Sequence, residues 1–140
     1  MEIYRLGPGD EARVVAATPL FDRPPHPAAV QAFLADPASL LLVAYIDAQP
    51  VGFLRAHELR QLDTPRPQVL LYEIAVAPPF QRRGVARSLI DALKTICGAH
   101  HAEELFVITN ATNMPAMGLY QSTGGQRDAV DDVVFVYPFM

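Results

Sequence analysis

The sequence predicts an α/β (α+β) fold built as a single domain over residues 1–140. Two observations predict this class. Apolar runs rich in β-formers, above all 39–46 and 70–76, have the length of buried strands. The segment 85–97 instead repeats its apolar residues every three or four positions, as an amphipathic helix does. With 140 residues, 51% hydrophobic and 19% charged, the chain can bury one sizeable core.

The elements before residue 70 follow from local patterns. Asp10 suits the N-cap of a helix, because its side chain can accept from the first free amides. Asp36 should close a second helix, since the following Pro disfavours helical backbone there. In order, the expected elements are a strand at 2–6, a helix from Asp10, a helix ending at Asp36, and strands at 39–46 and 51–59 joined by a turn at 47–50.

The second half is expected to alternate strands and helices. Pro78 and Pro79 stop the strand at 70–76, and a helix opens shortly after them. Gly98 is expected to end that helix. The remaining expected elements are a strand at 105–109, a helix at 113–122 ended by Gly124 and Gly125, and a last strand at 130–139.

Composition narrows the function classes. A net charge of −4 and a pI near 5.4 argue against a nucleic-acid partner. No apolar run has the length of a membrane span, and the N-terminus lacks a signal-peptide pattern, so we expect a cytoplasmic protein with no membrane partner. Cys97 is the single cysteine and lies on an apolar helix face, which favours a core role over a nucleophilic one. His100 and His101 have no acid or thiol at ligand spacing, so no metal is expected.

The stretch from the strand at 70–76 into the next helix has the form of an anion site. The first amides of a helix lack intrahelical partners, and the helix dipole favours negative charge there. Gly84 lets an anion approach the backbone, and Arg82 and Arg83 add positive charge. Two arginines at a helix start can also be simply solvated. Since the dipole disfavours cations at that end, an anion partner is the more economical interpretation.

Two motifs resemble signatures of the GNAT superfamily of N-acyltransferases. The first is Gln81, Gly84 and Ala86, which match Gln/Arg-x-x-Gly-x-Gly/Ala after a strand. The second runs over 113–125 and resembles Asn-x-x-Ala-x-x-Leu-Tyr-x-x-x-Gly-Phe, with Gly125 in place of the final aromatic residue. The resemblance implies a mixed, twisted sheet of six to seven strands with about four helices. It also implies acyl-CoA in the splay between the fourth and fifth strands.

Acetyl-CoA is the cosubstrate that this resemblance implies. Its pantetheine arm would pair with the strand that ends at Val76, and its diphosphate would lie on the turn that follows. Asn113 would reach the cofactor or simply cap its helix. The implied cofactor-binding residues are Ile74, Ala75, Val76, Gln81, Arg82, Arg83, Gly84, Val85, Ala86, Asn113 and Tyr120.

Glu73 and Tyr120 are the candidate catalytic residues. N-acetyl transfer needs a neutral amine and a protonated leaving thiolate, so Glu73 is expected to accept the amine's proton. The same carboxylate could instead bind a cationic acceptor, or be a buried acid satisfied by a neighbouring strand. Tyr120 is expected to protonate the thiolate, with an amphipathic core tyrosine as the alternative.

The acceptor follows from a closer resemblance, to the small aminoglycoside 3-N-acetyltransferases. It rests on 72–76, 106–109, 123–125 and 131–137, and it implies an aminoglycoside acceptor and a role in antibiotic resistance. Glu73 and Asp132 are the implied substrate-binding acids. No acid stands directly before Asn113, where that family commonly carries several, so another small amine or a peptide amine stays an alternative.

A third hypothesis is a GNAT module that binds acyl-CoA without turnover. The presence of both Glu73 and Tyr120 disfavours this hypothesis. The apolar segment 133–139 can serve as core or as the edge of a homodimer.

Overall fold

A computed structural model describes residues 1–139 in two compact units, Met1–Thr109 and a second that begins at Asn110. The single domain expected for the whole chain stays a prediction. No helix among the described residues is long and apolar enough to cross a membrane.

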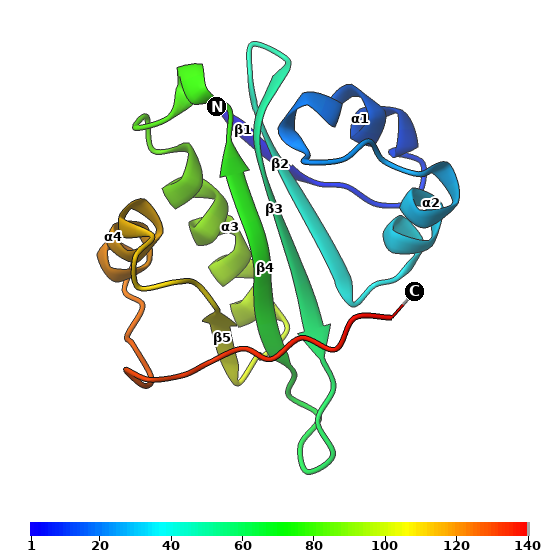
Figure 1. Ribbon diagram of the computed structural model, residues 1–140. Helices are drawn as coiled ribbons and strands as arrows, with labels where there is room; N and C mark the ends of the chain where they lie inside the picture. Colours follow the sequence, from blue (N-terminus) through cyan, green and yellow to red (C-terminus); the bar gives the residue numbers. More distant parts are fainter. Residues whose placement is uncertain (140) are drawn as a thin grey trace. The chain divides into compact units, whose positions relative to one another are not determined.

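The first unit holds the sheet (Figure 1). Within residues 1–139 it has five strands in the order β1-β2-β3-β4-β5. The first four pair antiparallel and β4 pairs parallel with β5, so the mixed sheet is confirmed. The strands are β1 Glu2–Arg5, β2 Ser39–Ile46, β3 Gln49–Leu59, β4 Gln68–Val76 and β5 Glu104–Val107.

The turn between β2 and β3 is tighter than expected. Only Asp47 and Ala48 lie between the strands, and both have positive φ, 50° and 63°. That is the backbone of a two-residue hairpin turn whose twist matches the flanking strands. The hairpin itself was predicted from the sequence.

Helices cover both faces of this sheet (Figure 1). Phe53 of β3 packs with Val14 and Leu34, which come from the helical segment before β2. Its neighbour Gly52 points the other way and lies against Val85 at the start of the helix between β4 and β5. The helices are α1 Glu11–Ala16, η1 Thr18–Leu20, α2 Pro27–Ala35, η2 Pro78–Phe80 and α3 Val85–Ala99.

The end of α3 differs from the sequence prediction. Gly98 lies inside the helix, and His101 takes the left-handed conformation at φ 55°. The His101 amide donates to the Gly98 carbonyl (3.2 Å) and the Ala102 amide to that of Cys97 (2.9 Å). This is a Schellman arrangement, which usually places glycine where His101 stands. The glycine rule therefore placed the end of the helix too early.

The second unit contains one helix among its described residues, α4 Met114–Ser122. The Gly125 amide donates to the Tyr120 carbonyl (2.8 Å), and Gly124 has φ 96°, so this helix ends at the predicted glycines.

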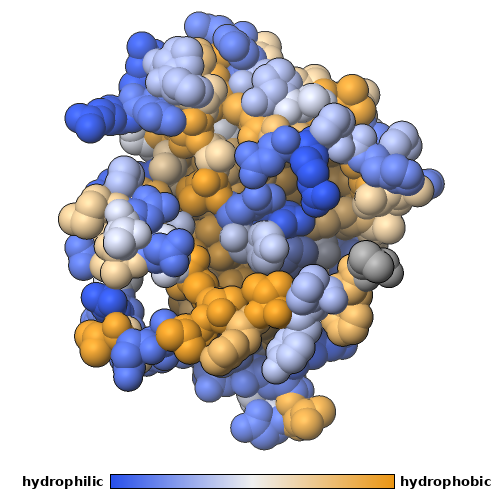
Figure 2. All heavy atoms as spheres, viewed as in Figure 1, coloured by the Kyte–Doolittle hydropathy of each residue, from blue (hydrophilic) through white to orange (hydrophobic). Residues whose placement is uncertain are grey.

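The strand predicted at 130–139 is wrong, and so is a sheet of six to seven strands. Val133, Val134, Phe135 and Val136 are 69–81% exposed, so neither face of the segment is covered. Orange residues gather in Figure 2 along the course that this segment takes in Figure 1. A β-favouring sequence becomes a strand only with a paired edge and a covered face. The described part of this segment has neither.

Candidate active site

The candidate site begins where β4 leaves β5. The two strands pair from Gln68 with Glu104 to Leu71 with Val107, and the pairing ends there. β4 continues to Val76, still paired with β3 on its other side. The edge of β4 over 72–76 therefore has no strand beside it among the described residues of the first unit. A splay of the fourth and fifth strands is what the resemblance of the two motifs implied.

The backbone of Ile74 and Val76 faces that open edge. The amide of Ala77 donates to the Val51 carbonyl of β3 at 2.8 Å. Because backbone groups alternate sides along a strand, those of Val76 and Ile74 point away from β3. Gln81 already donates its side-chain amide to the Val76 carbonyl (3.0 Å). The Ile74 amide and carbonyl and the Val76 amide are left facing the opening.

The turn after β4 presents backbone amides. Arg82 and Gly84 both have left-handed backbone, with φ of 62° and 81°. Gly84 is the N-cap of α3 and has no side chain with which to cap the first turn of that helix. A left-handed residue followed by helical ones turns successive amides into a concavity that suits an anion. The left-handed Arg82 costs about 1–2 kcal/mol, which is typical of backbone retained for a function.

Gly52 fixes how closely α3 approaches this turn. A Cβ at Gly52 would lie 3.0 Å from Cγ1 of Val85 and 3.1 Å from the Ala75 carbonyl oxygen. Val85 opens α3 and is buried. The missing side chain in β3 therefore lets the first turn of α3 sit directly against the end of β4.

A hollow of about 300 Å³ lies beside the end of β4. Leu20 of η1, Pro50 of β3 and Ala75 of β4 are among its lining residues. Its walls come from the β2–β3 hairpin and from the helical segment on the opposite face from α3. It gives the open stretch of β4 a recess on that face.

A β-bulge in β4 turns Tyr72 and Glu73 toward the same side. Arg55 of β3 pairs with Glu73, but the next residue, Ala56, pairs with Leu71, so Tyr72 is extra. Arg55 Nε lies 3.1 Å from Glu73 Oε1, and the guanidinium lies 4.1 Å from the centre of the Tyr72 ring. The Glu73 side chain is partly exposed, and its carboxylate is already paired with the Arg55 guanidinium of the neighbouring strand.

His57 completes this side of the sheet. Its ring meets those of Phe33 and Tyr72 edge-on, at 5.7 and 6.1 Å between centroids. Burial lowers the pKa of His57 below 6.5, and the Arg55 guanidinium lowers it further, while Asp36 opposes them. Because side chains alternate along a strand, Arg55 and His57 of β3 lie on one face. The contact of Arg55 with Glu73 was not predicted from the sequence, although the order of two antiparallel hairpins could have indicated it.

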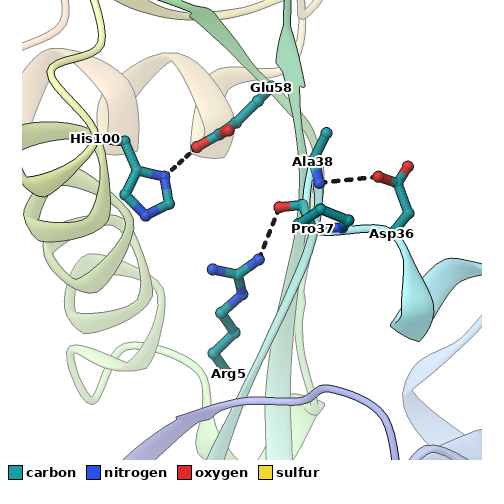
Figure 3. Close-up of polar contacts among 6 residues, drawn as sticks. All are labelled: Arg5, Asp36, Pro37, Ala38, Glu58 and His100. Atoms are coloured by element: carbon teal, nitrogen blue, oxygen red, sulfur yellow. Dashed lines mark hydrogen bonds and ion pairs between the residues drawn. The ribbon is translucent and has the colours of Figure 1, made fainter.

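Glu58 lies on the other face of β3. Figure 3 shows the His100 imidazole, just past α3, pointing at the Glu58 carboxylate, with which it forms a hydrogen bond. The acid that contacts His100 therefore comes from a strand and not from a neighbouring position in the sequence. Glu58 therefore lies on the face opposite Glu73.

The second unit holds the other predicted residues. Asn113 Oδ1 accepts from the Ala116 amide at 3.2 Å, so Asn113 caps α4. Burial raises the pKa of Tyr120, which keeps its hydroxyl protonated at neutral pH. A Cβ at Gly125 would lie 2.8 Å from the Tyr120 carbonyl oxygen, which explains why no aromatic residue stands there. Asp132 is exposed in the segment after α4.

The chain belongs to the acetyltransferase (GNAT) family, because the sequence model of that family matches residues 11–124. Among relatives, an N-alpha-acetyltransferase of Sulfurisphaera tokodaii is 29% identical over 89 residues. The match covers 59% of this chain and 53% of that protein, so the chain spans about half the length of this relative.

Solved structures of acetyltransferases have the same fold. The aminoglycoside acetyltransferase meta-AAC0020 from an uncultured soil metagenomic sample, in complex with trehalose, is 26% identical with a TM-score of 0.87. The similarity covers 99% of this chain and 95% of that one, and the same protein is known in complex with sisomicin. The aminoglycoside N-acetyltransferase AAC(6')-Iy, in complex with CoA, has a TM-score of 0.79 at 23% identity, over 98% of this chain and 93% of that one. This last likeness concerns the fold alone.

Proposed function

We propose that this protein is an acetyl-CoA-dependent N-acetyltransferase that transfers an acetyl group directly to a primary amine. The observation that carries the proposal is the open edge of β4. Within residues 1–139, Ile74 and Val76 direct unpaired backbone groups into the space left by β5, and the uncapped start of α3 follows within ten residues. Family membership supports the same reaction class.

Acetyl-CoA fits these groups by chemistry. An amide-containing pantetheine arm pairs with Ile74 and Val76 as an added strand would. The diphosphate lies on the amides from Arg82 to Ala86, where left-handed Gly84 leaves open space. The side chain of Gln81 fixes the turn by its bond to the Val76 carbonyl. Asn113 contributes from the cap of α4.

The cosubstrate supplies the activated acetyl group, and the protein moves two protons. Glu73 accepts the proton of the acceptor amine, directly or through water. The amide of Ile74 or Val76 polarises the acetyl carbonyl. Tyr120 protonates the leaving thiolate, and its raised pKa keeps that proton available at neutral pH.

An aminoglycoside, acetylated at its 3-amino group, is the first acceptor that we propose. The similarity to meta-AAC0020, which is known with sisomicin, supports an aminoglycoside. The 3-amino position rests on the sequence resemblance alone. Glu73 and Asp132 bind the cationic amines in this proposal.

The α-amino group of a peptide is the second candidate. The relative from Sulfurisphaera tokodaii is an N-alpha-acetyltransferase, which supports this acceptor. The Arg55 guanidinium beside Glu73 also favours a peptide amine, because a polycation has to compete with that guanidinium for the carboxylate.

A CoA-release assay across kanamycin, gentamicin, a polyamine and a short peptide amide tests the proposal. Replacing Glu73→Gln should lower kcat by about 10²-fold or more with acetyl-CoA affinity unchanged. Glu58→Gln is the matched control, since it removes an acid from the opposite face of the sheet. An equal loss in both variants, or no release with any amine, would refute the proposed reaction.

A further inference from the structure

Arg55 has more hydrogen-bond donors than the structure uses. Its Nε is buried and lies 3.1 Å from Glu73 Oε1, yet its N–H is not aligned with any acceptor. Within residues 1–139 the terminal amino groups of the guanidinium make no hydrogen bond either. A guanidinium carries five donors in a rigid fork. Arg55 therefore presents an unused fork beside the proposed base.

The surroundings hold this fork in place. The Tyr72 ring lies under the guanidinium at 4.1 Å, and His57 packs edge-on against that ring. Burial and the Arg55 charge keep the pKa of His57 low, so the imidazole stays neutral at neutral pH and adds no second cation. The side chains of Arg55 and Glu73 are 34% and 39% exposed, which leaves both accessible to a ligand.

We infer that Arg55 determines acceptor specificity by binding a carbonyl or carboxylate oxygen adjacent to the amine that Glu73 receives. Glu73 offers a carboxylate that can accept a proton, and Arg55 beside it offers a fork of hydrogen-bond donors. An α-amino amide or a peptide N-terminus has the complementary pair, an amine and a carbonyl oxygen on neighbouring atoms. This inference rests on the proposed function, and of the two acceptors proposed there it supports the α-amino group of a peptide over the aminoglycoside.

The same guanidinium weakens binding of polycations. An aminoglycoside brings several ammonium groups to a carboxylate that is already paired, and each meets the charge of Arg55. A guanidinium stays protonated at every accessible pH, so this repulsion persists. Specificity can thus arise from repulsion of one class together with attraction of another.

Binding of two probes to the full chain tests the inference. Affinities for alanyl-alanine amide and for kanamycin are measured by calorimetry with CoA present, so no turnover is required. In Arg55→Gln, affinity for the amide should fall about tenfold or more, because charge-assisted bonds to its carbonyl are lost. Affinity for kanamycin should instead rise several-fold. Arg60→Gln removes the same charge from an exposed position just past β3 and should change neither.

Opposite shifts for the two probes exclude a merely structural effect, since a distorted site would weaken both. Arg55→Lys should keep the weak kanamycin binding but lose most of the amide binding, because an ammonium lacks the fork. Shifts in the same direction, an equal effect of Arg60→Gln, or no binding of the amide to the wild type would overturn the inference. If neither amine releases CoA, the proposed reaction fails, while opposite shifts in affinity still support this role of Arg55.

Discussion

Gly52→Ala tests how the start of α3 is positioned. The new Cβ would lie 3.0 Å from Val85 Cγ1 and 3.1 Å from the Ala75 carbonyl oxygen. Forcing a methyl group into such a packed space costs about 1–3 kcal/mol. The smaller freedom of alanine in the unfolded chain offsets about 0.4–1 kcal/mol of this. We expect a net loss of about 1 kcal/mol in the free energy of unfolding.

Urea denaturation measures this loss as a lower midpoint at an unchanged slope. Gly98→Ala is the matched control, because a Cβ there meets nothing within 4 Å and Gly98 lies inside α3. That variant should be more stable by about 0.5–1 kcal/mol. Affinity for CoA should fall in Gly52→Ala and stay constant in Gly98→Ala. If both variants gain stability, the close contact between β3 and α3 does not constrain the fold as argued.

Three further outcomes are expected. Gly125→Ala should lower the free energy of unfolding by about 1–3 kcal/mol in urea, since its Cβ would lie 2.8 Å from the Tyr120 carbonyl oxygen; unchanged stability would contradict this contact. Ala48→Gly should raise the thermal midpoint, with a gain of about 1 kcal/mol, because φ is 63° there and only glycine adopts it freely. His57 should titrate below pH 6.5 by NMR. Because the unfolded chain then binds the proton first, its contribution to stability should be full above pH 6.5 and decline as the pH falls. His57→Gln should remove that part of the decline.

Most of the secondary structure could be predicted because its signals are local. The strand at 39–46 has the predicted bounds, and the apolar spacing that predicted the helix beginning at Val85 depends on residues three or four apart. The last strand failed for a physical reason. Residues 133–136 have β-favouring side chains, but strand formation depends on a partner that a local pattern does not contain.

The candidate site was predictable in part. The open edge at Ile74 and the turn at Gly84 were expected from the resemblance, and strand pairing supports the first directly. The bulge at Tyr72 was not expected, since an apolar run of seven residues gives no sign that one of them is an extra, unpaired residue. Without the bulge the contact of Arg55 with both Tyr72 and Glu73 could not be derived. Binding of cosubstrate and acceptor at these residues stays a prediction.

The order of strands also has a consequence for how the protein is made. β2, β3 and β4 follow one another in the chain and in space, so a nascent chain can pair them through a two-residue turn and the loop 60–67. β5 joins only after the whole of α3 has been synthesised and laid across the sheet. The pairing of β4 with β5 is therefore expected to form last in this unit. In a variant of lower stability, β5 should separate from β4, and its amides should exchange hydrogen, before the antiparallel strands β2, β3 and β4 unfold.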